Sequence, residues 1–391
     1  MFSLRLKQLR LARGLSLDEL AAEMGGIVSK QALSKYELGT AHPSPVVLNK
    51  LAAALRVKAA HLMSEPAIAV NFIAYRRRSG LPKREQEKVQ SLVVHTLEER
   101  LRLLFLSEPT ELEPLPVERW KVDKMEETET AAMALREQWK LGLDPIGSLV
   151  GVLEDHAVQV LEIDADQRFD GISAVATDQT GQQISAAVVT RRGVPGERQR
   201  LNLAHELGHL VLKIGENVNE EKAAFRFGAA FLAPAEAIQR EIGRQRTMVQ
   251  PAELLLLKQR FGLSMQSLLY RLCDLHIITE SHFKQWFIDI NRLGWRLNEP
   301  GELSPEQPQW VRQQVLRLLA EGLLTKEEAE AISGEALETS LPLSLIERQA
   351  FLKLPLAERR RKMAAQADKM VAVYIEDKER DEWQGGDFID Y

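Results

Sequence analysis

Two histidines and a glutamate lie close together in one apolar stretch of the chain. His205, Glu206 and His209 follow the pattern His-Glu-x-x-His inside the segment RLNLAHELGHLVL. Side chains four residues apart on a helix share one face, so both imidazoles can coordinate one divalent ion, usually zinc. Glu206 would then act as a general base towards water, a combination that cleaves amide bonds. The alternative is an amphipathic helix whose histidines are ordinary hydrogen-bonded side chains.

A hydrolytic zinc site takes a third protein ligand, and the chain offers an acid at a suitable distance. We expect the first helix to cover Arg198–Lys213, and the next to begin with EEKAAFRFGAAFLAP. The small residues of this second segment allow two helices to approach closely. A carboxylate in its first turn, from Glu220 or Glu221, would then face the two histidines.

Length and composition set the broad class of the protein. A chain of 391 residues, with 45% hydrophobic and 27% charged residues, is typical of a globular protein of two or three domains. The net charge of −5 hides an asymmetry. Residues 1–65 carry nine basic and five acidic residues, whereas residues 374–391 carry two basic and seven acidic ones. We therefore expect different partners at the two ends.

Several function classes are excluded or disfavoured. The single cysteine, Cys273, cannot form an intrachain disulfide, and together with the lack of a signal peptide this favours the cytoplasm. No apolar run reaches the roughly 18 residues of a membrane span, so no membrane partner is expected. The chain also lacks a glycine-rich phosphate loop, which argues against a nucleotide-hydrolysing motor.

The first 66 residues read as a bundle of short helices. Ser16 caps a predicted helix at Leu17–Met24, with Glu19 completing a capping box, and Ser29 caps the next, Lys30–Leu38. Gly25-Gly26 separates the two. Two short helices around a tight glycine turn, the second rich in polar residues, are typical of a helix-turn-helix.

Residues 3–63 resemble a Cro/C1-type (XRE-like) DNA-binding domain, and the resemblance is carried by LRLARGLSLDELAAEMG, VSKQALSKYELGTAHPS and LNKLAAALRV. It implies that the helix from Ser29 to Leu38 enters the major groove of a double-stranded operator, bound by a homodimer. Base edges would be reached by Lys30, Gln31 and Ser34, and phosphates by Ser16 and Lys35. One departure is Leu17, where relatives often have glutamine. The alternative is a helical bundle that docks only to proteins.

The middle of the chain alternates helices and strands. We expect strands at Val158–Ile163, Ile172–Thr177 and Ile184–Thr190, forming a small antiparallel sheet surrounded by helices. The predicted fold is therefore mainly α, with a small α+β zinc-peptidase core and an N-terminal all-α helix-turn-helix domain.

The segments RQRLNLAHELGHLVL and EEKAAFRFGAAFLAP, preceded by FDGIS, resemble the ImmA/IrrE-type metallopeptidase family, whose members often carry an XRE-type domain. The resemblance implies one Zn²⁺ per chain, held by His205, His209 and Glu221, with Glu206 as the catalytic base. Two departures are Phe225, in place of the usual asparagine, and Gly228, in place of alanine. Candidate donors to the oxyanion are Tyr270, Arg271 and His276.

The last fifty residues differ from the rest. They include a helix that begins at Pro355 and end in WQGGDFIDY, and they resemble the C-terminal segment of short bacterial antitoxin proteins. This resemblance implies a toxin partner that is contacted by Trp383, Phe388 and Tyr391. The alternative is a tail that folds back on its own domain.

These observations predict five regions: a DNA-binding domain at 1–66, a helical connector at 67–120, the peptidase domain at 121–290, a helical extension at 291–340, and the tail at 341–391. The leading hypothesis is a DNA-binding transcription regulator fused to a zinc endopeptidase. Its substrate would be a regulatory protein such as a repressor, in a toxin–antitoxin or stress-response system. The alternative hypothesis is a non-proteolytic repressor or antitoxin whose metal domain only senses or scaffolds.

Overall fold

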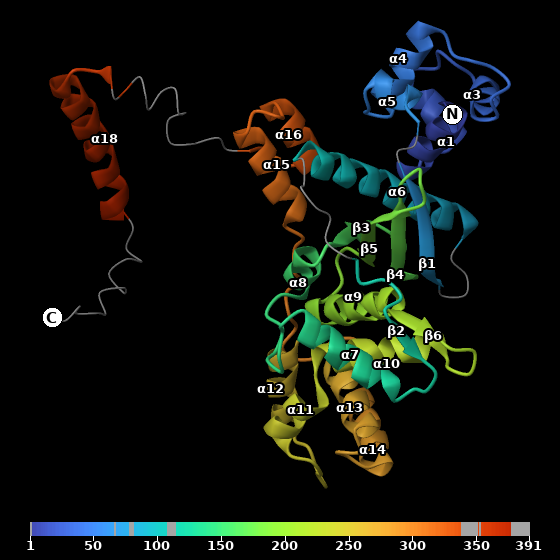
Figure 1. Ribbon diagram of the computed structural model, residues 1–391, viewed down its shortest axis with the longest axis vertical. Coiled ribbons are helices and arrows are strands. Elements are labelled where there is room, and N and C mark those ends of the chain that lie inside the picture. Colours follow the sequence, from blue (N-terminus) through green and yellow to red (C-terminus); the bar gives the residue numbers. More distant parts are fainter. Residues whose placement is uncertain are drawn as a thin grey trace. The chain divides into compact units, whose positions relative to one another are not determined.

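The computed structural model describes residues 2–65, 68–77, 82–107, 115–337, 351 and 353–376 of the chain (Figure 1). Residues 1–333 form one compact unit and residues 334–391 a second. The second unit contains helix α18 (Leu356–Glu376). No helix in the described ranges is both long and apolar enough to cross a membrane.

A bundle of five helices opens the chain: α1 (Phe2–Ala12), α2 (Leu17–Glu23), α3 (Lys30–Glu37), α4 (Pro45–Ala54) and α5 (Ala59–Met63). Leucines such as Leu6, Leu20 and Leu33 are fully buried in its core. Serine hydroxyls accept backbone N–H groups at the starts of α2, α3 and α4, which satisfies donors that a helix start leaves open. The predicted helix-turn-helix is confirmed in α2 and α3.

Helix α6 (Lys83–Leu106) lies between this bundle and a β-sheet (Figure 1). Val89, Val93 and Leu97 on one face pack against the sheet. On the side of the bundle, Arg5 of α1 forms a buried ion pair with Glu98 of α6. A hydrophobic face and a charged face therefore make α6 the element that joins the two layers.

The sheet has the order β1-β4-β5-β3, with β1 (Ala69–Arg77), β3 (Val158–Ile163), β4 (Phe169–Thr177) and β5 (Gln183–Arg191). The connector predicted as helical at 67–120 contains the helix α6 but also the strand β1, because residues 69–77 pair with β4, about a hundred residues further along the chain. The expected antiparallel sheet was also wrong: β3 pairs parallel with β5, so the sheet is mixed. Both differences depend on long-range pairing, which local periodicity does not encode.

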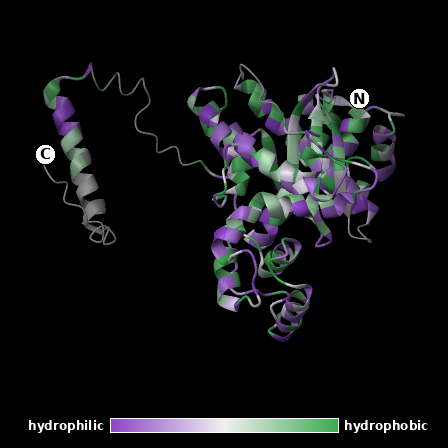
Figure 2. Ribbon diagram, turned by 60° about the horizontal axis from the view of Figure 1, so that its bottom comes forward, coloured by the Kyte–Doolittle hydropathy of each residue, from purple (hydrophilic) through white to green (hydrophobic). Residues whose placement is uncertain are grey.

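The face of the sheet opposite α6 is covered by α9 (Gly196–Val211) (Figure 1). Further elements surround α9, and the helices among them are banded in hydrophilic and hydrophobic colours, as expected of partly buried helices (Figure 2). They are β2 (Trp120–Val122), α7 (Glu127–Gln138), α8 (Leu149–Asp155), β6 (Leu212–Ile214), α10 (Glu220–Leu232), α11 (Ala235–Ile242), α12 (Pro251–Phe261), α13 (Met265–Asp274) and α14 (Glu280–Arg292). Helices α15 (Trp310–Ala320) and α16 (Lys326–Ser333) pack on each other instead, and α15 contacts α6 (Figure 1).

Helix α8 begins at Leu149, where Ser148 caps it by accepting the N–H of Gly151. Helix α15 begins at Trp310. The short parallel pair β2–β6 was not predicted, since three-residue strands leave almost no periodic signal.

Candidate metal centre and nucleic-acid interface

Helix α9 is buried almost all round, which sets the environment of its polar residues. Of its 16 residues, 14 are buried. Leu203, Leu207 and Leu210 pack into the largest hydrophobic core, together with strand residues such as Val188. A polar side chain on such a helix must find a partner, because burying it unpaired is costly.

His205 and His209 point at one another and at an acid of the next helix. Their Nε2 atoms are 3.0 Å apart. The carboxylate of Glu221, in the first turn of α10, lies 3.5 Å from each of these nitrogens. We call these three residues the α9 cluster. Ligand atoms from all three lie within 4.8 Å of one another.

The spacing of the α9 cluster suits a single metal ion. Tetrahedral zinc with bonds of about 2.0–2.1 Å places its ligand atoms about 3.3 Å apart. The observed separations of 3.0, 3.5 and 3.5 Å bracket this value. Two imidazoles and one carboxylate are also the donors that zinc accepts in hydrolytic sites. His205, His209 and Glu221 could therefore hold such an ion.

Glu220, the competing ligand candidate, takes a different position. Its Oε1 lies 3.2 Å from Nδ1 of His209, the ring nitrogen that points away from the cluster. A proton on Nδ1 can be donated to this carboxylate, which leaves the lone pair of Nε2 directed at Glu221 and His205. The two adjacent acids thus contact opposite sides of one imidazole.

Small residues bring α9 and α10 together. A Cβ at Gly208 would lie 3.1 Å from the Cα of Ala224, and a Cβ at Gly228 would lie 3.0 Å from the backbone nitrogen of His205. The close approach expected from the small residues of α10 is therefore confirmed. Phe225, which replaces the family's asparagine, packs its ring against His205 with centroids 4.1 Å apart.

Glu206 is also buried, at 1% exposure, and the strand β4 defines its surroundings. The hydroxyl of Ser173 hydrogen-bonds to its carboxylate and lies 3.0 Å from its backbone oxygen. A Cβ at Gly171 would lie 2.5 Å from Oε1 of Glu206, so this position requires glycine. Sequence reasoning did not assign either residue a role, although both lie in the FDGIS segment.

The predicted DNA-contacting residues lie on α3 and at the start of α2. Gln31 and Lys35 are exposed, and Ser34 is half-buried. Lys30 is exposed too, and its ammonium group pairs with Asp18 of α2 at 2.5 Å. The hydroxyl of Ser16 accepts the N–H of Glu19, so it caps α2. The four α3 residues share one short helix whose leucine, Leu33, is fully buried.

Comparisons with known families agree with this geometry. A family model described as helix-turn-helix matches residues 6–62. The peptidase M78 model, described as an IrrE N-terminal-like domain, matches residues 154–273, which include the whole α9 cluster. The chain therefore carries an XRE-type helix-turn-helix domain followed by an ImmA/IrrE-type domain. No curated protein and no solved structure matches the chain.

The first half of α9 in the ImmA/IrrE-type domain is fixed by polar contacts from outside the helix. Arg200 forms an ion pair with Glu306, whose carboxylate also accepts the backbone N–H of Val150 at 2.7 Å. Lys258, fully buried, pairs with Glu197 at 2.6 Å. These contacts hold the helix that carries His205 in place, and the segment after α14 supplies one of them.

Two of the three residues considered as donors to an oxyanion contact other parts of the protein, and the third is exposed. Arg271 forms a buried ion pair with Glu129 and donates to the backbone oxygen of Ala233 at 3.1 Å. Tyr270 packs its ring against Phe283 at 4.9 Å, and His276 is exposed. The predicted contact residues of the tail, Trp383, Phe388 and Tyr391, lie outside the described residues.

Proposed function

We propose that this protein is a cytoplasmic DNA-binding transcription regulator whose ImmA/IrrE-type domain is a zinc-dependent endopeptidase. The observation that carries the proposal is the convergence of His205, His209 and Glu221, at separations that suit one zinc ion, with Glu206 next to them in the same helix. A zinc ion held there would polarise a peptide carbonyl and make water more acidic.

Three residues of the chain would have the remaining roles in catalysis. Glu206 accepts the proton of the attacking water and passes it to the leaving amine. Ser173 holds the carboxylate of Glu206 in one orientation by a hydrogen bond. Glu220 fixes the tautomer of His209, so that Nε2 keeps its lone pair for the ion. Contacts of the described residues support the roles of Ser173 and Glu220, and the place of Glu206 beside His205 on the same helix supports its role.

Replacing Glu206 by glutamine tests the peptidase directly. The amide keeps the shape of the side chain but cannot accept the proton, so we expect cleavage to fall by about 10²–10⁴-fold with the bound metal unchanged. Cells that produce wild-type protein and Glu206→Gln can be compared by mass spectrometry of new protein N-termini. The matched control is Glu216→Gln, an exposed glutamate beyond α9, which should cleave like the wild type. Identical N-termini in wild type and Glu206→Gln would contradict the proposal.

A second candidate function is a non-proteolytic regulator whose metal domain senses or scaffolds. It is favoured by one observation, the burial of His205, Glu206 and His209, which are 0%, 1% and 4% exposed. Only Glu221, with half its side chain exposed, brings the α9 cluster to the surface. Under this alternative, gene regulation in cells would survive Glu206→Gln and be lost in Glu221→Ala.

We further propose that the regulator binds a double-stranded operator as a homodimer through α3. Binding should weaken steeply with salt, because phosphate neutralisation releases counterions. Gln31→Ala should remove about 1–3 kcal/mol of discrimination at the base that it reads, measured by selection from a random DNA library. Asn49→Ala, an exposed amide on α4, is the matched control and should leave the preference unchanged. An unaltered preference in Gln31→Ala would remove Gln31 from the interface.

The remaining partners follow from the two domains and the tail. An endopeptidase beside a DNA-binding domain fits a protein substrate that is itself a regulator, such as a repressor. The acidic, aromatic tail at 341–391 fits a toxin with a basic surface. The proposed toxin partner can be tested by pull-down with the full-length protein and with a chain that ends at residue 340. Only the full-length protein should capture the toxin.

A further inference from the structure

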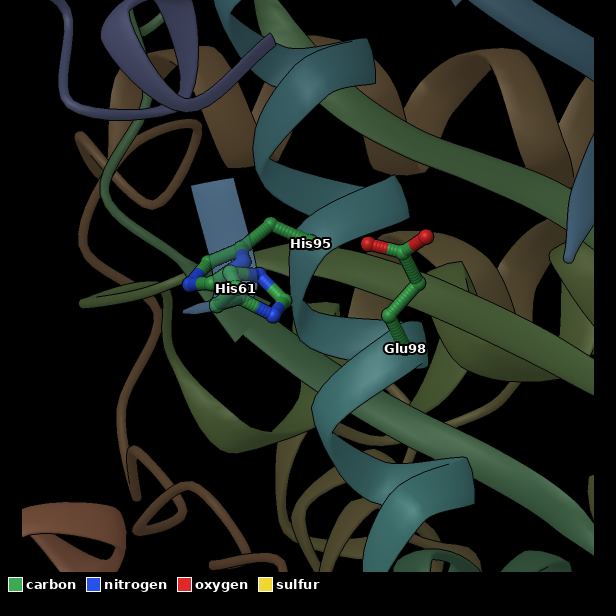
Figure 3. A group of neighbouring side chains, drawn as sticks. All are labelled: His61, His95 and Glu98. Carbon is green, nitrogen blue, oxygen red and sulfur yellow. The ribbon is translucent and has the colours of Figure 1, made fainter. Parts of the chain in front are cut away.

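A second group of histidines lies where the DNA-binding bundle meets α6 (Figure 3). His61 belongs to α5, and His95 and Glu98 lie one turn apart on α6. Ligand atoms from the three residues lie within 4.8 Å of one another. Figure 3 shows the two imidazoles together beside α6, with Glu98 on the adjacent turn. We call these three residues the seam cluster.

Each member of the seam cluster has a buried polar atom that nothing in the described part of the chain satisfies. These atoms are Nε2 of His61, Nδ1 of His95 and Oε1 of Glu98. Glu98 is only 7% exposed. Buried polar atoms are almost always paired, because an unpaired one costs folding free energy. Three such atoms in one place indicate a partner that is not an amino acid of the described chain.

The chemical types of the three side chains suit a metal ion. Two imidazole nitrogens and a carboxylate are donors that divalent transition metals accept. The charges around the histidines are mixed: burial lowers the pKa of both imidazoles and Arg5 lowers it further, whereas Glu99 raises it. Arg102 adds positive charge at His61, and Arg13 adds it at His95.

The positive charge of Arg5 disfavours a bound cation, but its contacts leave one oxygen of Glu98 available. Its guanidinium binds one oxygen of Glu98, Oε2, and the backbone oxygen of Glu65 at 3.1 Å. The other oxygen, Oε1, remains available. Arg5 thus orients the carboxylate in the way that outer partners orient metal-binding acids, while Glu98 and Glu99 offset its charge.

We propose that His61, His95 and Glu98 bind a divalent transition metal of the zinc class, which joins the DNA-binding bundle to α6. Two imidazoles and a carboxylate are ligands that zinc and cobalt accept, and a water would complete four-coordination. Small side-chain rotations would bring ligand atoms that now lie within 4.8 Å to the roughly 3.3 Å of a tetrahedral site. Because the ligands come from α5 and α6, the ion would stabilise the docking of one element on the other. This site does not depend on the proposed peptidase.

The test uses full-length, tag-free protein carrying His205→Ala and His209→Ala, which removes the α9 cluster. Titration with Co²⁺ should show about one equivalent bound per chain, with the visible absorption of four-coordinate cobalt, and Zn²⁺ should displace it. Adding His61→Ala and His95→Gln should abolish this binding. Adding His42→Ala instead, an exposed histidine of the same bundle, should leave it intact.

The outcomes separate the two sites. Wild-type protein should bind about two equivalents of zinc, and protein with only His61→Ala and His95→Gln about one. If the α9 cluster holds no metal, wild type would bind about one equivalent, and the seam substitutions would remove it. The proposal is overturned if the His205→Ala/His209→Ala protein binds no cobalt, as expected if water alone satisfies the three buried atoms. This readout keeps the seam cluster intact and so does not depend on whether the seam variants fold.

Discussion

The α9 cluster and the seam cluster use the same donors, two histidines and a glutamate, but they are built differently. In the α9 cluster, both histidines come from one helix and their Nε2 atoms are 3.0 Å apart. In the seam cluster, the histidines come from two helices that belong to different layers of the molecule, and the ligand atoms lie within 4.8 Å of one another. The first arrangement follows from helix geometry, whereas the second exists only when α5 is docked on α6.

We expect the α9 cluster to be more rigid than the seam cluster. The α9 cluster is supported by close helix packing at Gly208 and Gly228, where no larger residue fits without displacement. At the seam cluster, the buried ion pair between Arg5 of α1 and Glu98 of α6 joins the bundle to the helix that carries two of the three residues. A site held by backbone packing should tolerate changes elsewhere in the molecule, while a site held by docking should respond to them. Three substitutions test this contrast.

The largest effect is expected from Arg5→Met. It leaves the charge of Glu98 buried without its partner, so we expect a loss of about 3–5 kcal/mol in the free energy of unfolding, measured by urea titration. The matched control is Arg102→Met, which breaks the half-exposed pair with Glu99 and should cost no more than about 1 kcal/mol. Cobalt binding should weaken at the seam cluster and stay unchanged at the α9 cluster. Equal weakening at both sites would show that the two clusters are not independently supported.

The second effect is expected from Glu221→Ala. It removes the proposed third ligand of the α9 cluster, so zinc affinity there should fall by more than the roughly 10–100-fold that loss of an outer hydrogen-bond partner costs. Competition with a chromophoric chelator measures the affinity. Glu216→Ala, an exposed glutamate between α9 and α10, should have no effect. Full zinc affinity in Glu221→Ala would remove this residue from the ligand set.

The smallest effect is expected from Glu220→Gln. The amide can still accept a hydrogen bond from Nδ1 of His209 but lacks the negative charge, so zinc affinity should fall by about 10–100-fold or less. The same chelator competition applies. A loss as large as that of Glu221→Ala would mean that Glu220 is the inner ligand, which would reverse the assignment made from the distances.

The helices were predicted well because their signals are local. Serine caps, glycine turns and apolar spacing predicted the short helices of the N-terminal bundle, and the family models bear out both domain types. The strand β1 was missed, because residues 69–77 acquire their conformation by pairing with β4 rather than from their own sequence. The parallel pairing of β3 with β5 was missed for the same reason.

The candidate metal centre likewise combines a feature that local sequence predicts with features that depend on tertiary packing. The spacing of His205 and His209 is a property of one helix, and the sequence alone indicated it. The different positions of Glu220 and Glu221 around His209, the hydrogen bond from Ser173 to Glu206 and the contact between Gly171 and that carboxylate join separate elements.

The sequence by itself determined which helices form, which two domains are present and which two imidazoles share a face, because each depends on residues a few positions apart. Only the tertiary structure decided which acid approaches both histidines, which strand lies against Glu206 and which histidines meet at the seam. Those relations join separate elements, from 12 residues apart for His209 and Glu221 to 34 for His61 and His95, so local propensity does not determine them.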